Sequence, residues 1–463
     1  MKHLLFTLSL FLFFAFKINA QSVIQIGSTT VNVDTAYSGV DVPWEILYGP
    51  DNYLWVTERK GLVSRIDPVA HTKTVILDLT ASIYAQSEAG LLGMKLHPNF
   101  ATIKEVFLVY TFGSSATNAK ERLVKYTYNN TSLVNPQILI DSIDADINHN
   151  GSRLLFLPDG TLLMTTGDAL NTANAQNLNS KNGKVLRVNT NGTIPANNPF
   201  PGSYVYTYGH RNPQGLLLTP NGTVYESEHG PSNDDEFQIL ESSRNYGWPN
   251  VEGFCNLAAE ITFCSANNVK EPIFNWSPTI APADLIYYSN PGFPEFHDKV
   301  IMAVLKDKKL VAMQLNAAGT LSVSQASYLT NMFGRLRDLC VGPNNEIYIA
   351  TNGTNPTNPS PNINQIIKLT PPNTVSVKEI KAGYNTLVYP TITKEIITVE
   401  LNNPEAEDLA LKISDVTGSI VRKDKVSSGK QQVSLNGLPQ GIYFLTLHDL
   451  DNKQVLIKKI IKE

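Results

Sequence analysis

Short stretches of alternating apolar and polar residues, each entered through a proline-containing turn, recur along the first three quarters of the chain. Each copy has a proline, then Asp or Asn with Gly or Asn, then an alternating apolar run. This order is typical of a tight turn followed by a β-strand. The clearest copies are GPDNYLWVTE from residue 49, LPDGTLLMTTGD from 157, TPNGTVYESEHG from 219 and GPNNEIYIATNG from 342.

The spacing of these copies indicates the architecture. A stretched copy, HPNFATIKEVFLVYTF, begins at residue 97, and the turn prolines are separated by roughly 50 to 60 residues or twice that. The double gap holds KVIMAVLKDKKLVAMQL, which reads as two strands around a polar turn. We therefore predict an all-β fold, a six-bladed β-propeller over residues 21–372.

The composition changes at the proline-containing stretch that ends at Asn373. LALKISDVTGSIVRKD and QQVSLNGLPQGIYFLTLHD predict short strands with glycine turns, hence a small β-sandwich over residues 373–463. The glycine turns, the LPQGIYFL run and the lysine-rich end resemble the C-terminal sorting domain of type IX secretion substrates. The usual Tyr-Pro-Asn-Pro opening is Tyr-Pro-Thr-Ile here, at residues 389–392. A sandwich for carbohydrate or matrix contact is the alternative.

Charge and the start of the chain bear on location. The 463 residues carry a formal net charge of −4, which provides no electrostatic case for nucleic acid or an anionic membrane as partner. Residues 1–20 have a basic start, a short apolar run and small residues before Gln21, the pattern of a secretory signal peptide. No other run is long enough to cross a bilayer, so we expect no transmembrane segment and an exported, secreted or cell-surface protein that passes through the periplasm.

The chain has three cysteines. Cys255 and Cys264 lie close together in a polar stretch, and export makes a local disulfide plausible, but spacing alone does not decide whether it forms. Cys340 lies in an apolar strand pattern and is expected to be a buried free thiol.

Several polar residues stand at strand ends without an evident structural reason. His149, between Asn148 and Asn150, is either a general base or an ordinary hydrogen-bonded histidine, and Asp168 ends the same hairpin. Arg335 and Arg337 are spaced i, i+2, so on a strand both point to one face and call for an anion between them. The alternative is a solvated face in which each arginine pairs with a local acid.

Two loops offer further candidates. In GHRNPQG, Arg211 and Asn212 are more than a turn requires. In SEHGPSNDDE, a Gly230-Pro231 bend precedes three acidic residues, which suits a hard cation such as Ca²⁺ but is equally common in soluble loops.

Taken together, these motifs resemble the soluble pyrroloquinoline-quinone-dependent glucose/sorbosone dehydrogenase family, a six-bladed propeller. The resemblance covers nearly the whole propeller region. It rests on EAGLLGMKLHP, GKVLRVNTNGTIPANNPF, YTYGHRNPQGL, SEHGPSNDDE, NYGWPNV and GRLRD.

The resemblance implies roles for these positions. His149, in a His-x-x-x-Arg context completed by Arg153, matches the base; Arg211 and Asn212 match the contacts to the quinone oxygens. The other implied positions are Gly230 and Pro231 for the carbonyls that hold Ca²⁺, Lys306, Arg335 and Arg337 for the cofactor carboxylates, Asp168 for the substrate side, and Trp276 for the pocket mouth.

Two positions and one loop region depart from the family pattern, and the loops near residues 255–268 look shorter or different. Glu88 places an extra acid near the quinone edge, and Asn148 replaces an aspartate beside the base. Cofactor binding is still expected, whereas the identity of the sugar is left open.

The expected function is therefore hydride transfer from an aldose or related sugar or polyol to pyrroloquinoline quinone with Ca²⁺, followed by an external electron acceptor. The rivals are a non-catalytic propeller that binds glycans or proteins, and a Ca²⁺-dependent lactonase. Export by the type IX secretion machinery follows from the C-terminal resemblance.

Overall fold

The computed structural model describes residues 22–353, 364–371, 386–401, 408–448 and 454–463. The chain divides into two compact units, Met1–Pro372 and Asn373–Glu463. The predicted signal peptide lies outside the described residues. No helix in the described part of the chain is both long and apolar enough to span a membrane.

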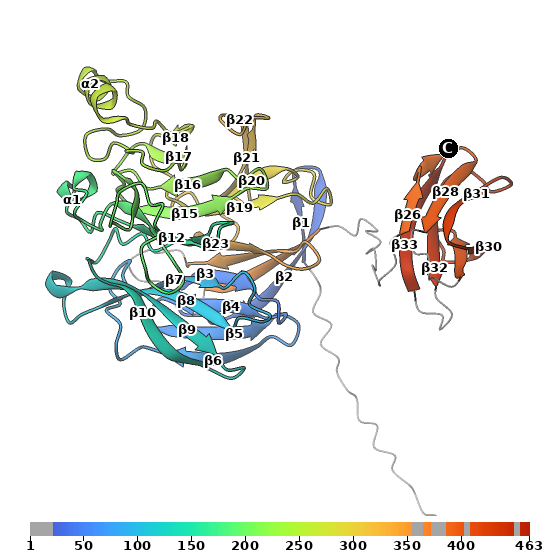
Figure 1. Ribbon diagram of the computed structural model, residues 1–463, viewed down its shortest axis with the longest axis horizontal. Coiled ribbons are helices and arrows are strands. Elements are labelled where there is room, and N and C mark those ends of the chain that lie inside the picture. The colour runs from blue at the N-terminus through green and yellow to red at the C-terminus, as the bar shows by residue number, and fades with distance from the viewer. Residues whose placement is uncertain (1–21, 354–363, 372–385, 402–407, 449–453) are drawn as a thin grey trace, which may run out of the picture. The chain divides into compact units, whose positions relative to one another are not determined.

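Within its described residues, the first unit forms six antiparallel sheets around one axis, which confirms the predicted six-bladed propeller (Figure 1). The first three sheets are β3 (Pro43–Tyr48), β4 (Leu54–Glu58), β5 (Leu62–Asp67) and β6 (Thr72–Asp78); β7 (Leu91–Leu96), β8 (Glu105–Phe112), β9 (Lys120–Tyr128) and β10 (Leu133–Asp144); and β11 (Leu154–Phe156), β12 (Leu162–Thr166), β13 (Lys184–Val188) and β14 (Val205–Tyr208). The next two are β15 (Pro213–Leu218), β16 (Val224–Glu228), β17 (Asp235–Ile239) and β18 (Phe274–Trp276); and β19 (Pro282–Tyr288), β20 (Lys299–Val304), β21 (Lys309–Leu315) and β22 (Ser322–Tyr328).

The sixth sheet closes the ring. It joins β23 (Leu336–Val341), β24 (Ile347–Thr351) and β25 (Gln365–Thr370) to β2 (Thr29–Ser38) and β1 (Ser22–Ile26). Strand β2 pairs antiparallel with β25, with Asn32 opposite Thr370. The two ends of the propeller sequence are thus hydrogen-bonded to each other in one blade.

The proline-containing repeats form the turns between the first and second strands of a blade. Every residue of the second strands β4, β12, β16 and β24 is buried. These strands alternate poorly in polarity because sheets pack against both of their faces. The outermost strand β22 is exposed or half-buried along its whole length.

Antiparallel pairing brings the start of each first strand beside the end of the second, as in the pairs Pro43–Glu58 and Pro213–Glu228. Loops that precede a first strand and loops that follow a second strand therefore meet at one mouth of the axis. This mouth receives most of the candidate residues.

A buried arginine links several blades at the axis. Arg153 Nη1 lies 2.6 Å from Glu45 Oε2 and 2.7 Å from Asp338 Oδ1, and its Nε lies 3.5 Å from Asp284 Oδ1. Its guanidinium also stacks 4.4 Å from the centroid of the Trp44 ring. The three carboxylates outweigh the effect of burial and raise the pKa of Arg153. The residue stabilises the hub of the propeller.

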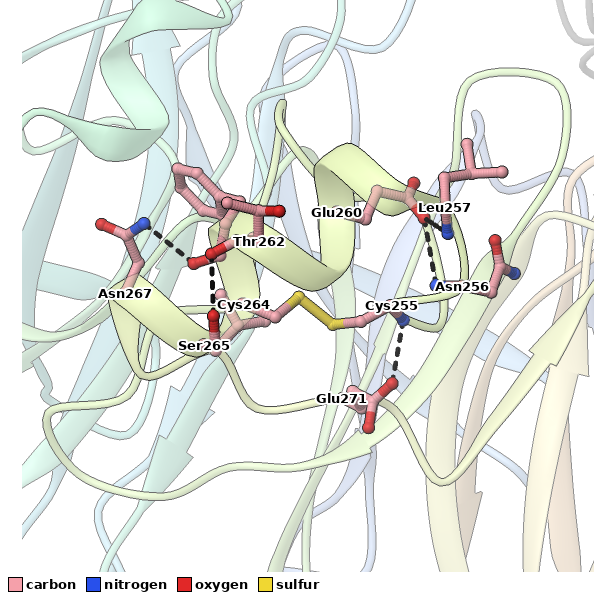
Figure 2. Close-up of a disulfide and its surroundings, with 12 residues drawn as sticks. Cys255, Asn256, Leu257, Glu260, Thr262, Cys264, Ser265, Asn267 and Glu271 are labelled. Atoms are coloured by element: carbon pink, nitrogen blue, oxygen red, sulfur yellow. Dashed lines mark hydrogen bonds between the residues drawn. A yellow bond between two sulfur atoms is a disulfide. The ribbon is translucent and has the colours of Figure 1, made fainter.

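The few helices lie in loops. They are η1 (Ala116–Asn118), α1 (Ala173–Gln176) and α2 (Ala258–Asn267). Figure 2 shows that Cys255 and Cys264 form a disulfide that ties the loop before α2 to the helix. The Glu260 carboxylate accepts the backbone N–H of Leu257 at the start of α2. Cys340 is free and buried, as predicted.

The second unit is a β-sandwich, as predicted. One sheet has β26 (Thr386–Tyr389), β28 (Ile396–Leu401) and β31 (Gly429–Ser434), and the other has β27 (Ile392–Thr393), β33 (Gln454–Lys462), β32 (Gly441–His448), β29 (Leu409–Ser414) and β30 (Ile420–Val426). Its own apolar core includes Ile397, Val399, Leu411 and Leu445, all essentially inaccessible to solvent.

Candidate active site

A polar cavity of about 240 Å³ opens at the mouth where first strands begin. Its wall is drawn from all six blades and the loops between them. The residues that bear on its chemistry are Trp44, Arg59, Glu88, Asn148, Gln214, His229, Arg335 and Arg337. Glu88 is the one acidic residue among the described residues of this wall.

Arg335 and Arg337 both line the cavity, while Leu336 between them is buried in the adjoining apolar core. This is the arrangement expected from i, i+2 spacing on a strand. Arg337 Nη1 donates to Gln214 Oε1 at 2.8 Å. Burial, followed by the nearby charge of Arg335, lowers the pKa of Arg337 to about 9. Arg337 is buried and Arg335 half-buried, and two guanidinium groups placed this way, without a carboxylate paired to them in the described part of the chain, favour an anionic ligand.

Arg59 also lines the cavity, and the sequence analysis missed it. It directly follows β4, in the GPDNYLWVTE repeat. The signal that could have found it is positional: Asp168 and His229 also follow second strands, two and one residues beyond β12 and β16. Residues just after a second strand reach the same mouth of the axis.

His149 and Asp168 form a hydrogen-bonded pair. The Nδ1 of His149 lies 2.8 Å from Oδ1 of Asp168, and Oδ2 of Asp168 accepts Nε1–H of Trp248, also at 2.8 Å. Asp168 is fully buried, so it faces the imidazole and the indole rather than an open substrate surface. A carboxylate on Nδ1 favours the tautomer with Nε2 unprotonated, which is the form a general base needs.

The loop that carries His149 is held by hydrogen bonds to Glu88 and Ser87. Its backbone has φ 57° at His149, and its N–H donates to Oε2 of Glu88 at 3.1 Å. The same Glu88 oxygen lies 3.4 Å from Nδ2 of Asn212. Asn148 accepts a hydrogen bond from Ser87 Oγ at 2.7 Å. Glu88 thus connects the histidine loop to the GHRNPQG loop.

The Arg211-Asn212 turn is held by one carboxylate. Oε1 of Glu228 accepts the backbone N–H of Arg211 and, at 3.0 Å, that of Asn212. The guanidinium of Arg211 donates to the carbonyl of His229 at 3.0 Å and lies 5.4 Å from the Trp248 ring centroid. Burial lowers the pKa of Arg211, although Asp168 and Glu228 oppose this effect.

Beneath this turn lies a buried polar cluster that the sequence analysis did not identify. Nδ1 of His210 lies 3.0 Å from Oε2 of Glu228 and 3.6 Å from Oε2 of Glu226. These three residues are the one group of His, Cys, Asp or Glu in the described part of the chain whose atoms could share a metal ion. Burial raises the pKa of Glu226 well above its ordinary value.

The acidic loop does not gather its carboxylates at one point. Asp235 accepts the backbone N–H groups of Gly230, Ile280 and Ala281 at 2.8, 2.6 and 2.7 Å. Asp234 accepts a hydrogen bond from the Asn275 side chain instead. These acids shape the bend.

Gly230 and Pro231 lie beside Arg211 and Trp248 in the lining of a small second cavity. A Cβ at Gly230 would lie 2.0 Å from the carbonyl oxygen of Asn233, so the bend requires glycine there. Its carbonyl groups remain the candidates for binding a cation.

Several predicted residues are not part of this cavity wall. Arg211, Gly230 and Pro231 line the second cavity instead, and the residues that line neither are His149, Asp168, Asn212, Lys306 and Trp276. Lys306 is exposed, and its Nζ donates to Thr279 Oγ1 at 2.8 Å, whereas its neighbour Leu305 does line the cavity. Trp276 is on β18, the outermost strand of its blade, where its Nε1–H lies 3.3 Å from Gln325 Oε1. The structure does not bring these two together with the arginines.

Residues 40–358 match the family described as glucose/sorbosone dehydrogenase. The chain is 28% identical to aldose sugar dehydrogenase YliI of Escherichia coli, over 71% of this chain and 92% of that protein. It is 36% identical to quinoprotein glucose dehydrogenase B of Acinetobacter calcoaceticus, over 47% of this chain and 52% of that protein.

Solved structures agree. The PQQ-bound aldose sugar dehydrogenase of Streptomyces coelicolor superposes with a TM-score of 0.64 at 28% identity, covering 73% of this chain and 98% of that one. Residues 387–463 match the family described as a secretion system C-terminal sorting domain. That domain implies delivery to the cell surface or beyond.

Proposed function

This chain belongs to the glucose/sorbosone dehydrogenase family, and we propose that it is a pyrroloquinoline-quinone- and Ca²⁺-dependent dehydrogenase that oxidises an aldose or a related sugar or polyol. The observation that carries the proposal is the cavity at the axis mouth. It is lined by Arg59, Arg335 and Arg337, and by Asn148 and Asn150, which flank His149 on both sides.

The cavity fits a polycarboxylate. Nε of Arg335 and Nε of Arg337 are buried and have no hydrogen-bond partner among the described residues. An unsatisfied buried donor costs about 1–3 kcal/mol, more when it is charged, and a carboxylate would remove that cost. Pyrroloquinoline quinone carries three carboxylates on a planar ring system, so the donor set suits it. When bound with Ca²⁺, it would supply a polarised carbonyl that accepts the hydride.

The residues of this chain would supply the general base, the hydrogen-bond donors and the Ca²⁺ ligands. Nε2 of His149 takes the proton of the substrate hydroxyl, while Asp168 keeps the proton on Nδ1 and stabilises the imidazolium that forms. Arg211 and Asn212, held by Glu228, present side-chain donors to the oxygen that gains charge. The carbonyls of Gly230 and Pro231 are the proposed Ca²⁺ ligands.

Reconstitution tests this proposal. Apo-protein is incubated with pyrroloquinoline quinone and Ca²⁺, and aldoses and polyols are screened with an artificial dye acceptor. His149→Gln should bind the cofactor as wild type does but lose at least about 10²-fold in kcat, because the amide cannot take a proton. A reconstituted variant that turns over within a few-fold of wild type would show that the base lies elsewhere. Wild type that does not bind the quinone would refute the proposal.

The C-terminal sandwich supports a proposed route of export. Residues 1–20 would direct the chain to the periplasm, and the sandwich would then engage the type IX secretion machinery. Removal of residues 373–463 should leave the propeller folded, because the sandwich has a separate core, but should abolish surface delivery. Surface labelling that finds the truncated protein outside the cell would contradict the sorting role.

A further inference from the structure

Arg59 enters the cavity from the first blade. Both backbone polar groups of Arg59 are hydrogen-bonded. Its N–H donates to the carbonyl of Val42 at 3.1 Å, and its carbonyl accepts the N–H of Leu91 at 2.8 Å. The first bond lies within the first blade, and the second joins that blade to the next one. The start of the side chain is therefore placed by the fold and not by a mobile loop.

A glycine makes room for this side chain. Gly90 has φ 152°, and a Cβ there would lie 2.2 Å from the carbonyl oxygen of Arg59 and 2.6 Å from its Cγ. Any larger residue at position 90 would displace the stem of the arginine. The local sequence thus allows the guanidinium to pass into the cavity wall.

The guanidinium of Arg59 is buried without being satisfied. Its Nε and Nη1 are inaccessible to water and have no hydrogen-bond partner among the described residues. Burial lowers the pKa of Arg59, and the carboxylates of Asp41 and Glu88 offset this only in part. The adjacent Lys60 instead pairs directly with Asp41, at 2.9 Å. Because Arg59 lines the cavity, a carboxylate bound there would offset the charge that burial leaves without an ion-pair partner among the described residues.

The charges around the cavity point to the kind of ligand. Arg59, Arg335 and Arg337 line it together with a single acid, Glu88, so the wall carries an excess of positive charge. Arg59 comes from the first blade, and Arg335 and Arg337 come from the start of β23 and the residue before it in the sixth, so the three cations reach the cavity from two blades. A ligand with several carboxylates around a rigid frame would satisfy them at once.

We propose that Arg59 is a third carboxylate-binding residue for the quinone, acting with Arg335 and Arg337. This inference rests on the proposed function and assigns a residue that lies outside the motifs of the binding site. Arg59 would take over the position expected of Lys306, whose side chain lies outside the cavity wall.

The test is the affinity of the apo-protein for pyrroloquinoline quinone, measured by quenching of intrinsic fluorescence with Ca²⁺ present. Arg59→Gln should raise the Kd by about 10- to 100-fold, as expected for a lost hydrogen bond to a charged group. Arg59→Lys keeps the positive charge but not the planar guanidinium group, so its Kd should lie between those of wild type and Arg59→Gln. Lys60→Gln is the matched control and should bind as wild type does, because its side chain is 62% exposed and lies outside the cavity wall.

The three monomethyl esters of the quinone identify the partner of Arg59. Wild type should bind the esters more weakly than the free acid, whereas Arg59→Gln should bind one of the three esters and the free acid alike. If Arg59→Gln loses affinity for each of the three esters as wild type does, or if its Kd for the free acid lies within threefold of wild type, the proposal is overturned. A change confined to the KM for sugar would also overturn it, by making Arg59 a substrate residue.

The outcomes separate this inference from the function on which it rests. Failure of wild type to bind the quinone refutes the function itself, whereas normal binding by both wild type and Arg59→Gln refutes only the role of Arg59. Circular dichroism and thermal melting establish that each variant is folded. If Arg59→Gln does not fold, Arg59→Lys with the three esters gives the same comparison.

Discussion

A buried glutamate next to the histidine loop should make the propeller sensitive to alkaline pH. Glu121, on β9, is 1% exposed, and the Ser152 hydroxyl donates to its carboxylate. Burial raises the pKa of Glu121 from 4.5 to about 8, and the hydrogen bond from Ser152 opposes this shift only in part. Ser152 follows His149 by three residues, so this carboxyl lies under the proposed base.

The direction and size of the effect follow from proton linkage. A carboxyl whose pKa is raised in the folded state stabilises the fold fully below its unfolded pKa, and this contribution is lost as pH rises through the folded value. For a shift from 4.5 to about 8, the loss between pH 5 and pH 9 comes to about 4 kcal/mol. The amide in Glu121→Gln cannot ionise, so this variant should not show that loss of stability between pH 5 and pH 9.

Urea unfolding of the propeller at pH 5 and pH 9 measures this difference. At pH 5 the variant should lie within about 1 kcal/mol of wild type, since only the hydrogen bond to Ser152 is altered. At pH 9 it should be the more stable protein by about 3 kcal/mol. Glu105→Gln is the control, because this half-buried residue at the start of β8 pairs with Lys125, and it should change the free energy of unfolding by less than about 1 kcal/mol. An equal difference between Glu121→Gln and wild type at both pH values would refute the reasoning.

Three further changes have defined outcomes. Arg153→Met leaves three buried carboxylates without their cation and should lower the free energy of unfolding by about 3–5 kcal/mol, as measured by urea titration. Asp168→Asn should keep quinone affinity but reduce kcat by at least about 10²-fold, because the amide no longer selects the tautomer of His149, and stopped-flow reduction of the bound quinone would show it. Replacing both Cys255 and Cys264 by serine should lower the free energy of unfolding by at most about 2.5 kcal/mol, as measured by calorimetry, since the disulfide closes a loop of 9 residues.

The propeller could be predicted because its turns are local. The Pro-Asp-Gly type of turn between first and second strands depends on a few adjacent residues, so it recurs visibly in sequence. The fifth blade lacks this signature because its corresponding loop, residues 289–298, is longer and buries Phe293 and Phe296 in the core. Only the polar turn between β20 and β21 revealed that blade.

The arrangement of site residues could be predicted only where those residues are close neighbours on one strand. The shared face of Arg335 and Arg337 follows from the period of a strand. By contrast, the bond from Trp248 to Asp168 and the reach of Arg59 depend on how separate blades pack, which no local pattern encodes. Blade packing also decides the position of Trp276. Its motif predicted a place at the pocket mouth, but the residue lies on β18, the outermost strand of its blade.

The shared sixth blade also sets the order of events during synthesis. Strands β1 and β2 pair with each other, yet β25, the other partner of β2, is among the last parts of the propeller to be made. The ring cannot close before β25 exists, so until then β2 has β1 as its one strand partner among the described residues. The same sheet begins with β23, beside Arg335. A substitution in β1 or β2 that weakens this blade should therefore also weaken retention of the proposed quinone beside β23, which dialysis of the reconstituted protein would show.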